Sequence, residues 1–299
     1  MSIFPTRILL ATDGSKEAEL ATKTALKLAQ QTGSELHVIH VLALPLDTQD
    51  PSSFEPDVRR QLEKRTRARL EEMVRRIEIS GGTVEGSHLR VGRPDAQIIT
   101  QAEEMGAGLI VMGSRGFGSM RRALTGSVSD SVVKHAHCPV MVVRGEPTEF
   151  PTKILLATDG SEEAELASST AADLAKSTNS ELHVVYVEPV SYVYEMTEWE
   201  TYRADLPDKL EQASEELAES RLETQVQKME EAGAQISGTH ARVGFPDVEI
   251  VGLAGKVGAG LIVMGSRGRG PLKRALMGSV SDSVVRRSHC PVLVVRTER

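Results

Sequence analysis

Two glycine-rich stretches, GSRGFGSMRRALTGS (113–127) and GSRGRGPLKRALMGS (265–279), contain residue types that bind anions. Glycine lets backbone N–H groups approach a ligand closely and can adopt positive φ. In each stretch the last glycine precedes a serine that opens an expected helix, whose unpaired N–H groups and dipole favour negative charge. We expect Ser127 to cap its helix and to donate to a phosphate oxygen. The nearby positive charges are Arg115, Arg121, Arg122, Arg267, Lys273 and Arg274.

Glycine spacing alone would also fit an exposed surface turn before an ordinary helix cap. Two well-known phosphate loops are excluded, because no Gly-Lys-Ser/Thr follows the fourth expected strand and no GxGxxG follows the first. Each stretch lies after a strand and before a helix, and this arrangement occurs in both halves of the chain. It therefore favours phosphate binding over a simple surface turn.

The sequence contains an internal repeat of one domain-sized unit. RILLATDGSKEAELA at 7–21 returns almost unchanged at 153–167, and the segment 106–144 returns at 258–296. The second copy is slightly longer between its second strand and Arg242. The repeat predicts two domains, 1–148 and 149–299, joined by the short linker GEPTEFPT.

Each copy reads as alternating strands and helices. In the first copy the strands are expected at 7–12, 35–42, 83–91, 108–112 and 139–143, and the helices at 15–33, 56–80, 94–105 and 126–135. This order predicts an α/β fold with a doubly wound parallel sheet. Such sheets bind ligands outside the carboxyl ends of their strands. Asp13, Val41 and the loop at Gly113 should therefore share one rim.

Composition narrows the class of protein. The 299 residues have a formal net charge of −7, which argues against nucleic acid or an anionic membrane as the main partner. The two cysteines, Cys138 and Cys290, are too few for a disulfide scaffold. The start MSIFPTRILLATD has no features of a signal peptide, so we expect a cytoplasmic protein without a membrane span.

ATDGS after the first strand, HVIHV as the second, VMGSRG followed by GSVS, and CPVMVV resemble the universal stress protein family in its ATP-binding branch. The resemblance covers nearly the whole chain as a tandem pair. It implies two tandem Rossmann-like domains of the adenine nucleotide alpha hydrolase-like type. Each would be a five-stranded parallel sheet of order 3-2-1-4-5 with helices on both faces. ATP, with Mg²⁺ brought by its phosphates, would lie between the ends of strands one and four.

The resemblance also implies which residues bind the nucleotide. Asp13 would face the ribose or a metal-bridged phosphate, and Val41 would meet adenine through its main chain. The implied residues of the first copy are Ala11, Thr12, Asp13, Val41, Met112, Gly113, Arg115, Gly116, Gly126, Ser127 and Val128. Those of the second copy are Ala157, Thr158, Asp159, Val187, Met264, Gly265, Arg267, Gly268, Gly278, Ser279 and Val280. Asp13 and Asp159 could alternatively be simple turn formers.

Three further features could have either a purely structural role or a functional one. His135, His137 and Cys138 resemble metal ligands, but Arg287 replaces the first of them in the second copy, which favours a buried thiol beside an exposed histidine. The segment 191–202 is expected to cover the second domain, with a nucleotide lid or a partner-binding patch as alternatives. The resemblance implies that the fifth strands pair the two domains within one chain, and a further homodimer stays open.

The leading functional prediction is a regulatory protein of the stress response that binds one ATP per domain and acts on a protein partner that the sequence does not identify. AMP and cyclic AMP remain alternative ligands. A slow ATP hydrolase is a second hypothesis, which the absence of a convincing general base weakens. A nucleotide-free interaction scaffold is the third.

Overall fold

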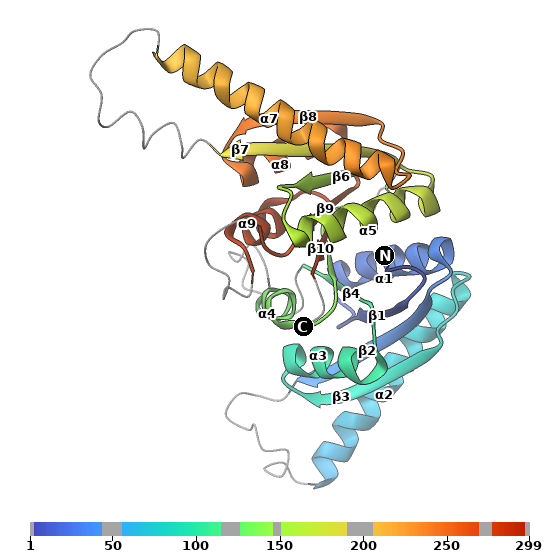
Figure 1. Ribbon diagram of the computed structural model, residues 1–299. Coiled ribbons are helices and arrows are strands. Elements are labelled where there is room, and N and C mark those ends of the chain that lie inside the picture. Colours follow the sequence, from blue (N-terminus) through green and yellow to red (C-terminus); the bar gives the residue numbers. More distant parts are fainter. Residues whose placement is uncertain are drawn as a thin grey trace. The chain divides into compact units, whose positions relative to one another are not determined.

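The computed structural model describes residues 3–43, 56–114, 126–145, 151–189, 206–268 and 277–296. The chain divides into a first unit, Ser2–Phe150, and a second unit, Pro151–Arg296. Each unit is a parallel sheet flanked by helices (Figure 1).

The first unit is built on five parallel strands. They are β1 (Arg7–Ala11), β2 (Glu35–Ala43), β3 (Gly86–Gly92), β4 (Leu109–Gly113) and β5 (Val140–Val143). Their order within the unit is β3-β2-β1-β4-β5, which confirms the predicted order 3-2-1-4-5. The strand order reverses between β1 and β4, so the switch point of the sheet lies where the family resemblance implied it.

Four helices connect these strands. They are α1 (Lys16–Thr32), α2 (Pro56–Ile79), α3 (Pro94–Met105) and α4 (Ser127–His135). The connections through α1 and α2 run one way along the sheet and those through α3 and α4 run the other way. Because crossovers between parallel strands are right-handed, the two pairs of helices cover opposite faces (Figure 1).

The second unit repeats this plan in the order β8-β7-β6-β9-β10. Its strands are β6 (Lys153–Thr158), β7 (Glu181–Pro189), β8 (Gly238–Gly244), β9 (Leu261–Gly265) and β10 (Val292–Val295). Its helices are α5 (Glu162–Thr178), α7 (Leu206–Glu231), α8 (Pro246–Val257) and α9 (Ser279–Arg287).

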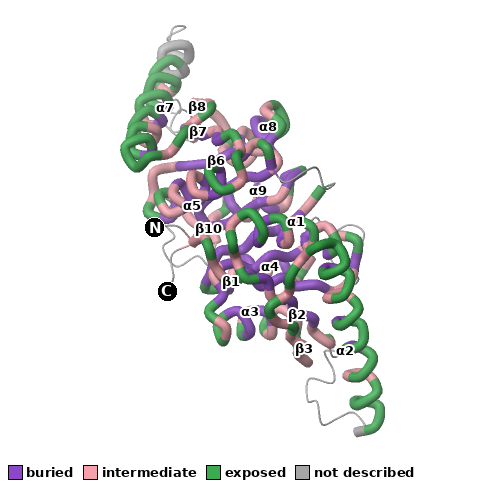
Figure 2. Tube along the Cα trace, turned by 90° about the vertical axis from the view of Figure 1, so that its right-hand side faces the viewer, coloured by how far each residue is buried: buried purple, intermediate pink, exposed green. Residues whose placement is uncertain are grey.

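Aliphatic strands form the core of each unit. Ile8, Leu9 and Leu10 of β1 are fully buried, as are Ile154, Leu155 and Leu156 of β6. Figure 2 shows burial concentrated along the central strands, with the outer sides of α2 and α7 exposed. A strand covered on both faces buries consecutive residues, which explains why the sequence shows unbroken apolar runs here rather than alternation.

The third strand is shorter than the sequence pattern predicted. The third strand was expected from residue 83, but β3 begins at Gly86, where pairing with His37 of β2 begins, and residues 83–85 do not join the strand. The expected cover at 191–202 lies outside the described residues.

Candidate functional site

The turn after the first strand of each unit is fixed by its own side chains. The Asp13 carboxylate accepts a hydrogen bond from Ser15 N at 2.9 Å, and Thr12 Oγ1 accepts one from Gly14 N at 3.3 Å. The corresponding distances at Asp159 and Thr158 are 3.0 and 3.3 Å. Both aspartates therefore form the turn, as the turn-forming alternative expected. Both are half-exposed and lie at the carboxyl ends of the strands.

In each unit, the serine that follows the fourth strand connects the fifth strand with the start of the next helix. Ser114, directly after β4, donates its N–H to Val143 O at 2.9 Å and accepts from Gly126 N at 2.8 Å. Ser129 Oγ also donates to Ser114 O, at 3.1 Å. Ser266, Gly278 and Ser281 repeat this arrangement, with the last two bonds both 2.8 Å long. These bonds hold the start of α4, and of α9, at the end of the adjacent strand.

The expectation that Ser127 caps its helix is wrong. The N-cap position is Gly126, with φ −73° and ψ 149°, and no side chain makes the capping hydrogen bond. Ser127 is the first helical residue, because the bond from Gly126 N to Ser114 O fixes where the helix begins. Gly278 and Ser279 are placed in the same way. By contrast, Ser15 caps α1 with a 3.2 Å bond from Ala18 N. The helix starts that were expected to meet an anion thus lack a side-chain cap.

A buried glutamate that sequence reasoning missed holds the entrance of the second glycine loop. Glu163, in the first turn of α5, is 5% exposed. Its carboxylate accepts bonds from Ser266 Oγ, Arg267 N and Arg267 Nε, each 2.6 Å long. The Arg267 side chain, predicted to contact phosphates, is therefore paired with Glu163. A signal existed, because the sequence places a glutamate at the same position of both copies, DGSKE and DGSEE.

The second unit also shows the Asp159 turn in contact with the glycine loop. A β-carbon on Gly268 would collide with the Asp159 carboxylate. Ser161 Oγ lies 3.5 Å from Arg267 O, and a β-carbon on Gly278 would lie 3.5 Å from the Cα atom of Arg267. The predicted residues Asp159, Arg267, Gly268 and Gly278 thus come together at one rim, as the sequence analysis expected of this loop.

Glycine is required at the end of the fourth strand for packing. A β-carbon on Gly113 would lie 2.9 Å from the carbonyl carbon of Glu17. One on Gly265 would lie 3.0 Å from that of Glu163. Few β-carbons approach backbone so closely, so the first turns of α1 and α5 pack directly on these strand ends.

The remaining predicted residues fall on the same strand ends and helix starts, or outside the described part. The buried ones are Ala11, Thr12, Met112, Ala157, Thr158, Val187 and Met264. Val41, Val128 and Val280 are partly exposed. Arg115 and Gly116 lie outside the described residues.

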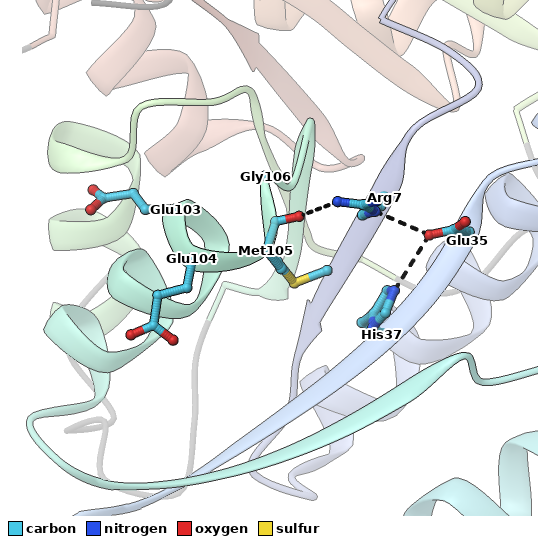
Figure 3. Close-up of a pocket in the computed structure, with 7 residues that line it drawn as sticks. All are labelled: Arg7, Glu35, His37, Glu103, Glu104, Met105 and Gly106. Atoms are coloured by element: carbon cyan, nitrogen blue, oxygen red, sulfur yellow. Dashed lines mark hydrogen bonds and ion pairs between the residues drawn. The ribbon is translucent and has the colours of Figure 1, made fainter.

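A hollow of the first unit lies at the opposite, amino end of the sheet (Figure 3). Arg7 donates from Nη1 to Met105 O at 2.7 Å and from Nε to Glu35 at 3.2 Å. Glu35 Oε2 lies 3.7 Å from His37 Nε2, an ion-pair distance too long for a hydrogen bond. In Figure 3 the side chains of Arg7, Glu35 and His37 face one another. They lie at the starts of β1 and β2, at the opposite end of these strands from the predicted site residues.

The residues that resembled metal ligands have other partners. His135 Nδ1 lies 2.8 Å from Ser131 O, and His137 Nε2 lies 2.7 Å from Glu103. Cys138 is buried, as is Cys290. Among the described residues, no three His, Cys, Asp or Glu side chains gather as metal ligands.

None of the helices in the described ranges is long and apolar enough to cross a bilayer.

The fold and the positions of the predicted residues define a tandem α/β protein. Each of its two units has a doubly wound sheet with one candidate site at the carboxyl ends of the strands. The sequence model of the Universal stress protein family matches residues 5–144 and again 151–296. The chain belongs to the universal stress protein family, as a tandem member.

Individual relatives agree with this assignment. A universal stress protein of Mycobacterium tuberculosis is 29% identical over 303 residues, which cover 97% of this chain and 96% of the relative. A shorter one from Thermus aquaticus is 39% identical over 137 residues, covering 46% of this chain and 97% of its own length. The crystal structure of a universal stress protein from Archaeoglobus fulgidus superposes with a TM-score of 0.71 at 24% identity, covering 99% of this chain and 98% of that one.

Proposed function

We propose that each unit binds one molecule of ATP and that the protein acts by reporting nucleotide occupancy to a regulatory partner during stress. The nucleotide would lie at the carboxyl rim, between the turn at Asp13 or Asp159 and the start of α4 or α9. This location is the switch point of each sheet, where doubly wound folds bind their ligands.

The observation that most supports the proposal is the pair of helix starts at Gly126 and Gly278. Each is held at the strand end by a backbone bond to a serine carbonyl, and neither has a side-chain cap. Their first-turn N–H groups suit phosphate oxygens, which the helix dipole also favours. Because a glycine occupies the N-cap position, the N-cap residue itself places no side chain between these groups and a ligand.

The acidic groups beside the second site fit a cation bound with the nucleotide. The Asp159 carboxylate occupies the place that a β-carbon on Gly268 would take, and an aspartate beside phosphates repels them unless a cation lies between. Mg²⁺ binds few protein carboxylates together with substrate phosphates and water, so Asp159, and Asp13 in the first unit, suit that role.

The remaining parts of the proposal rest on the family and the sequence. A cytoplasmic location, the domain limits 1–148 and 149–299, pairing of the fifth strands and a homodimer stay predictions.

Equilibrium dialysis with ATP and Mg²⁺ tests the function. We expect about two sites per chain, one of which is lost in Gly126→Val and the other in Gly278→Val. Both positions have φ of −73°, which valine adopts, so the variants should fold while their methyl groups cover the helix start. A circular dichroism spectrum like that of the wild type serves as the control. Absence of binding at millimolar ATP would refute the proposal.

A further inference from the structure

The rims of the two units differ beside the first-strand turn. RLE at 69–71 of α2 returns as RLE at 221–223 of α7, and the leucine of each motif is buried. Arg69 and Arg221 are therefore equivalent positions. The surrounding strand residues are not the same, because His40 and Leu42 of the first copy are replaced by Tyr186 and Glu188 in the second.

In the second unit Arg221 is held by two partners. Its Nη1 donates to Glu188 Oε2 at 2.7 Å and to Tyr186 Oη at 2.8 Å. Tyr186 Oη in turn donates to Glu188 Oε2 at 3.2 Å. Burial raises the pKa of Tyr186, so the phenol stays neutral and remains a donor. Glu188 is only 4% exposed, which makes its carboxylate a strong anchor for the guanidinium.

In the first unit Arg69 lies on the turn itself. A β-carbon on Gly14 would lie 2.8 Å from Arg69 Nη2 and 3.3 Å from Arg69 Nε. His40 next to it donates from Nδ1 to Thr12 O at 2.7 Å. Burial lowers the pKa of His40 although this hydrogen bond opposes the effect, and the positive charge of Arg69 lowers it further. Leu42 provides no carboxylate at the place where the second unit has Glu188.

Strand register places this difference at the rim. Tyr186 pairs with Thr158, the last residue of β6, and Glu188 lies two residues further along β7 on the same face. A strand rises about 3.3 Å per residue, so Glu188 stands beyond the end of β6, beside the turn that starts at Asp159. The charge of Glu188 is therefore close to the place proposed for the nucleotide.

We infer that Glu188 weakens the second site for polyphosphates, because it pairs with Arg221 and adds a negative charge that Leu42 does not add at the first site. This inference rests on the proposed function. It makes the two sites differ more for ATP than for adenosine, since the phosphates respond to the charges and adenosine carries none. For charges several ångströms apart near a protein surface we expect roughly a three- to tenfold difference in Kd.

Calorimetry on single-site variants tests it. Gly278→Val leaves the first site and Gly126→Val leaves the second, and each is titrated with ATP and with adenosine. The second site should bind ATP about three- to tenfold more weakly than the first. Adding Glu188→Leu, the residue of the first copy, should remove most of that difference and should change ATP binding more than adenosine binding.

The repeat supplies the converse variant. Leu42→Glu in the Gly278→Val protein should weaken ATP binding at the first site by a similar factor, and it decides the question even where Glu188→Leu does not fold. Equal ATP affinities at the two sites, or a change that adenosine shows as strongly as ATP, would overturn the inference and leave the proposed function standing. A wild-type protein that binds no ATP would overturn both.

Discussion

Glu163 provides a sharp test of how the second site is built. Its carboxylate makes three 2.6 Å bonds to groups of Ser266 and Arg267 while lying almost wholly out of water. We predict that Glu163→Gln loosens the loop entrance and destabilises the second unit. The matched control is Glu165→Gln, on the same helix, whose carboxylate is 56% exposed and lies 3.3 Å from the Lys228 ammonium.

The magnitude follows from the partners of each oxygen. Oε2 accepts from Ser266 Oγ and Arg267 N, so the glutamine oxygen would keep that place. The amide nitrogen would then face Arg267 Nε, a donor against a donor. Removing one member of a buried ion pair costs about 3–5 kcal/mol. Because the Arg267 side chain is 29% exposed and can turn toward water, we expect about 2–3 kcal/mol. The control should cost less than about 0.5 kcal/mol, as exposed pairs do.

Hydrogen exchange measured by mass spectrometry is the suitable assay, because a chain of two units need not unfold in one step. Peptides covering the start of α5 and residues 261–268 should exchange faster in Glu163→Gln, whereas peptides of the first unit should not change. Urea unfolding followed by circular dichroism gives the accompanying loss of stability. If Glu163→Gln and Glu165→Gln were indistinguishable in both measurements, the network would not hold the loop, and the reasoning from its short bonds would be refuted.

Two further predictions concern stability. Gly265→Ala should destabilise the second unit by about 1–3 kcal/mol in urea unfolding, because its β-carbon would press on the α5 backbone. Gly252→Ala, at a helical position with nothing within 4 Å, should instead stabilise by about 0.4–1 kcal/mol, and equal effects would contradict the packing argument. The imidazole pairs His37–His88 and His183–His240 have ring nitrogens 3.4 and 3.2 Å apart, and burial and then the partner imidazole lower the pKa values of His88 and His240 from 6.5. The other charged groups that act on these two rings are Arg90, Glu104 and Arg242. Below pH 6.5 the unfolded chain binds more protons at these positions, so stability should fall as pH drops from 7.5 to 5.5, and a double variant His88→Gln/His240→Gln should lose less over that interval.

The parallel sheet and the rim that carries the candidate site could be predicted because both follow from local patterns. Apolar runs such as RILLA specify buried parallel strands, and alternation with helices then favours a doubly wound sheet, whereas the strand order came from the family resemblance. The Asp-Gly-Ser turn was predictable for the same reason, since the Asp13 side chain bonds to a backbone group only two residues away.

The cap at Ser127 was misjudged because local preference and tertiary structure disagree. Serine outranks glycine at N-cap positions, so the sequence favours Ser127. The N-cap lies at Gly126, whose N–H bonds to the carbonyl of Ser114, twelve residues earlier in the chain. Local sequence preference does not reveal a bond over that separation. The pairs Glu163–Arg267 and Glu188–Arg221 were missed for a related reason. Their members are far apart in sequence, and no spacing rule joins them.

Comparison of the two copies shows which contacts depend on local sequence and which depend on residues from neighbouring strands and helices. Where the copies share residues, as at Asp13 and Asp159, the turn bonds agree to within 0.1 Å, at 2.9 and 3.0 Å. Where two strand residues differ, His40 and Leu42 against Tyr186 and Glu188, the arginine in the same helix position lies against the Gly14 turn in one copy and bonds to Tyr186 and Glu188 in the other. Changes at two rim positions thus accompany a different placement of one side chain, while the sheet, the turn and the helix start stay the same. The copies can therefore keep one fold while their sites diverge in affinity, and the exchange of Leu42 and Glu188 measures by how much.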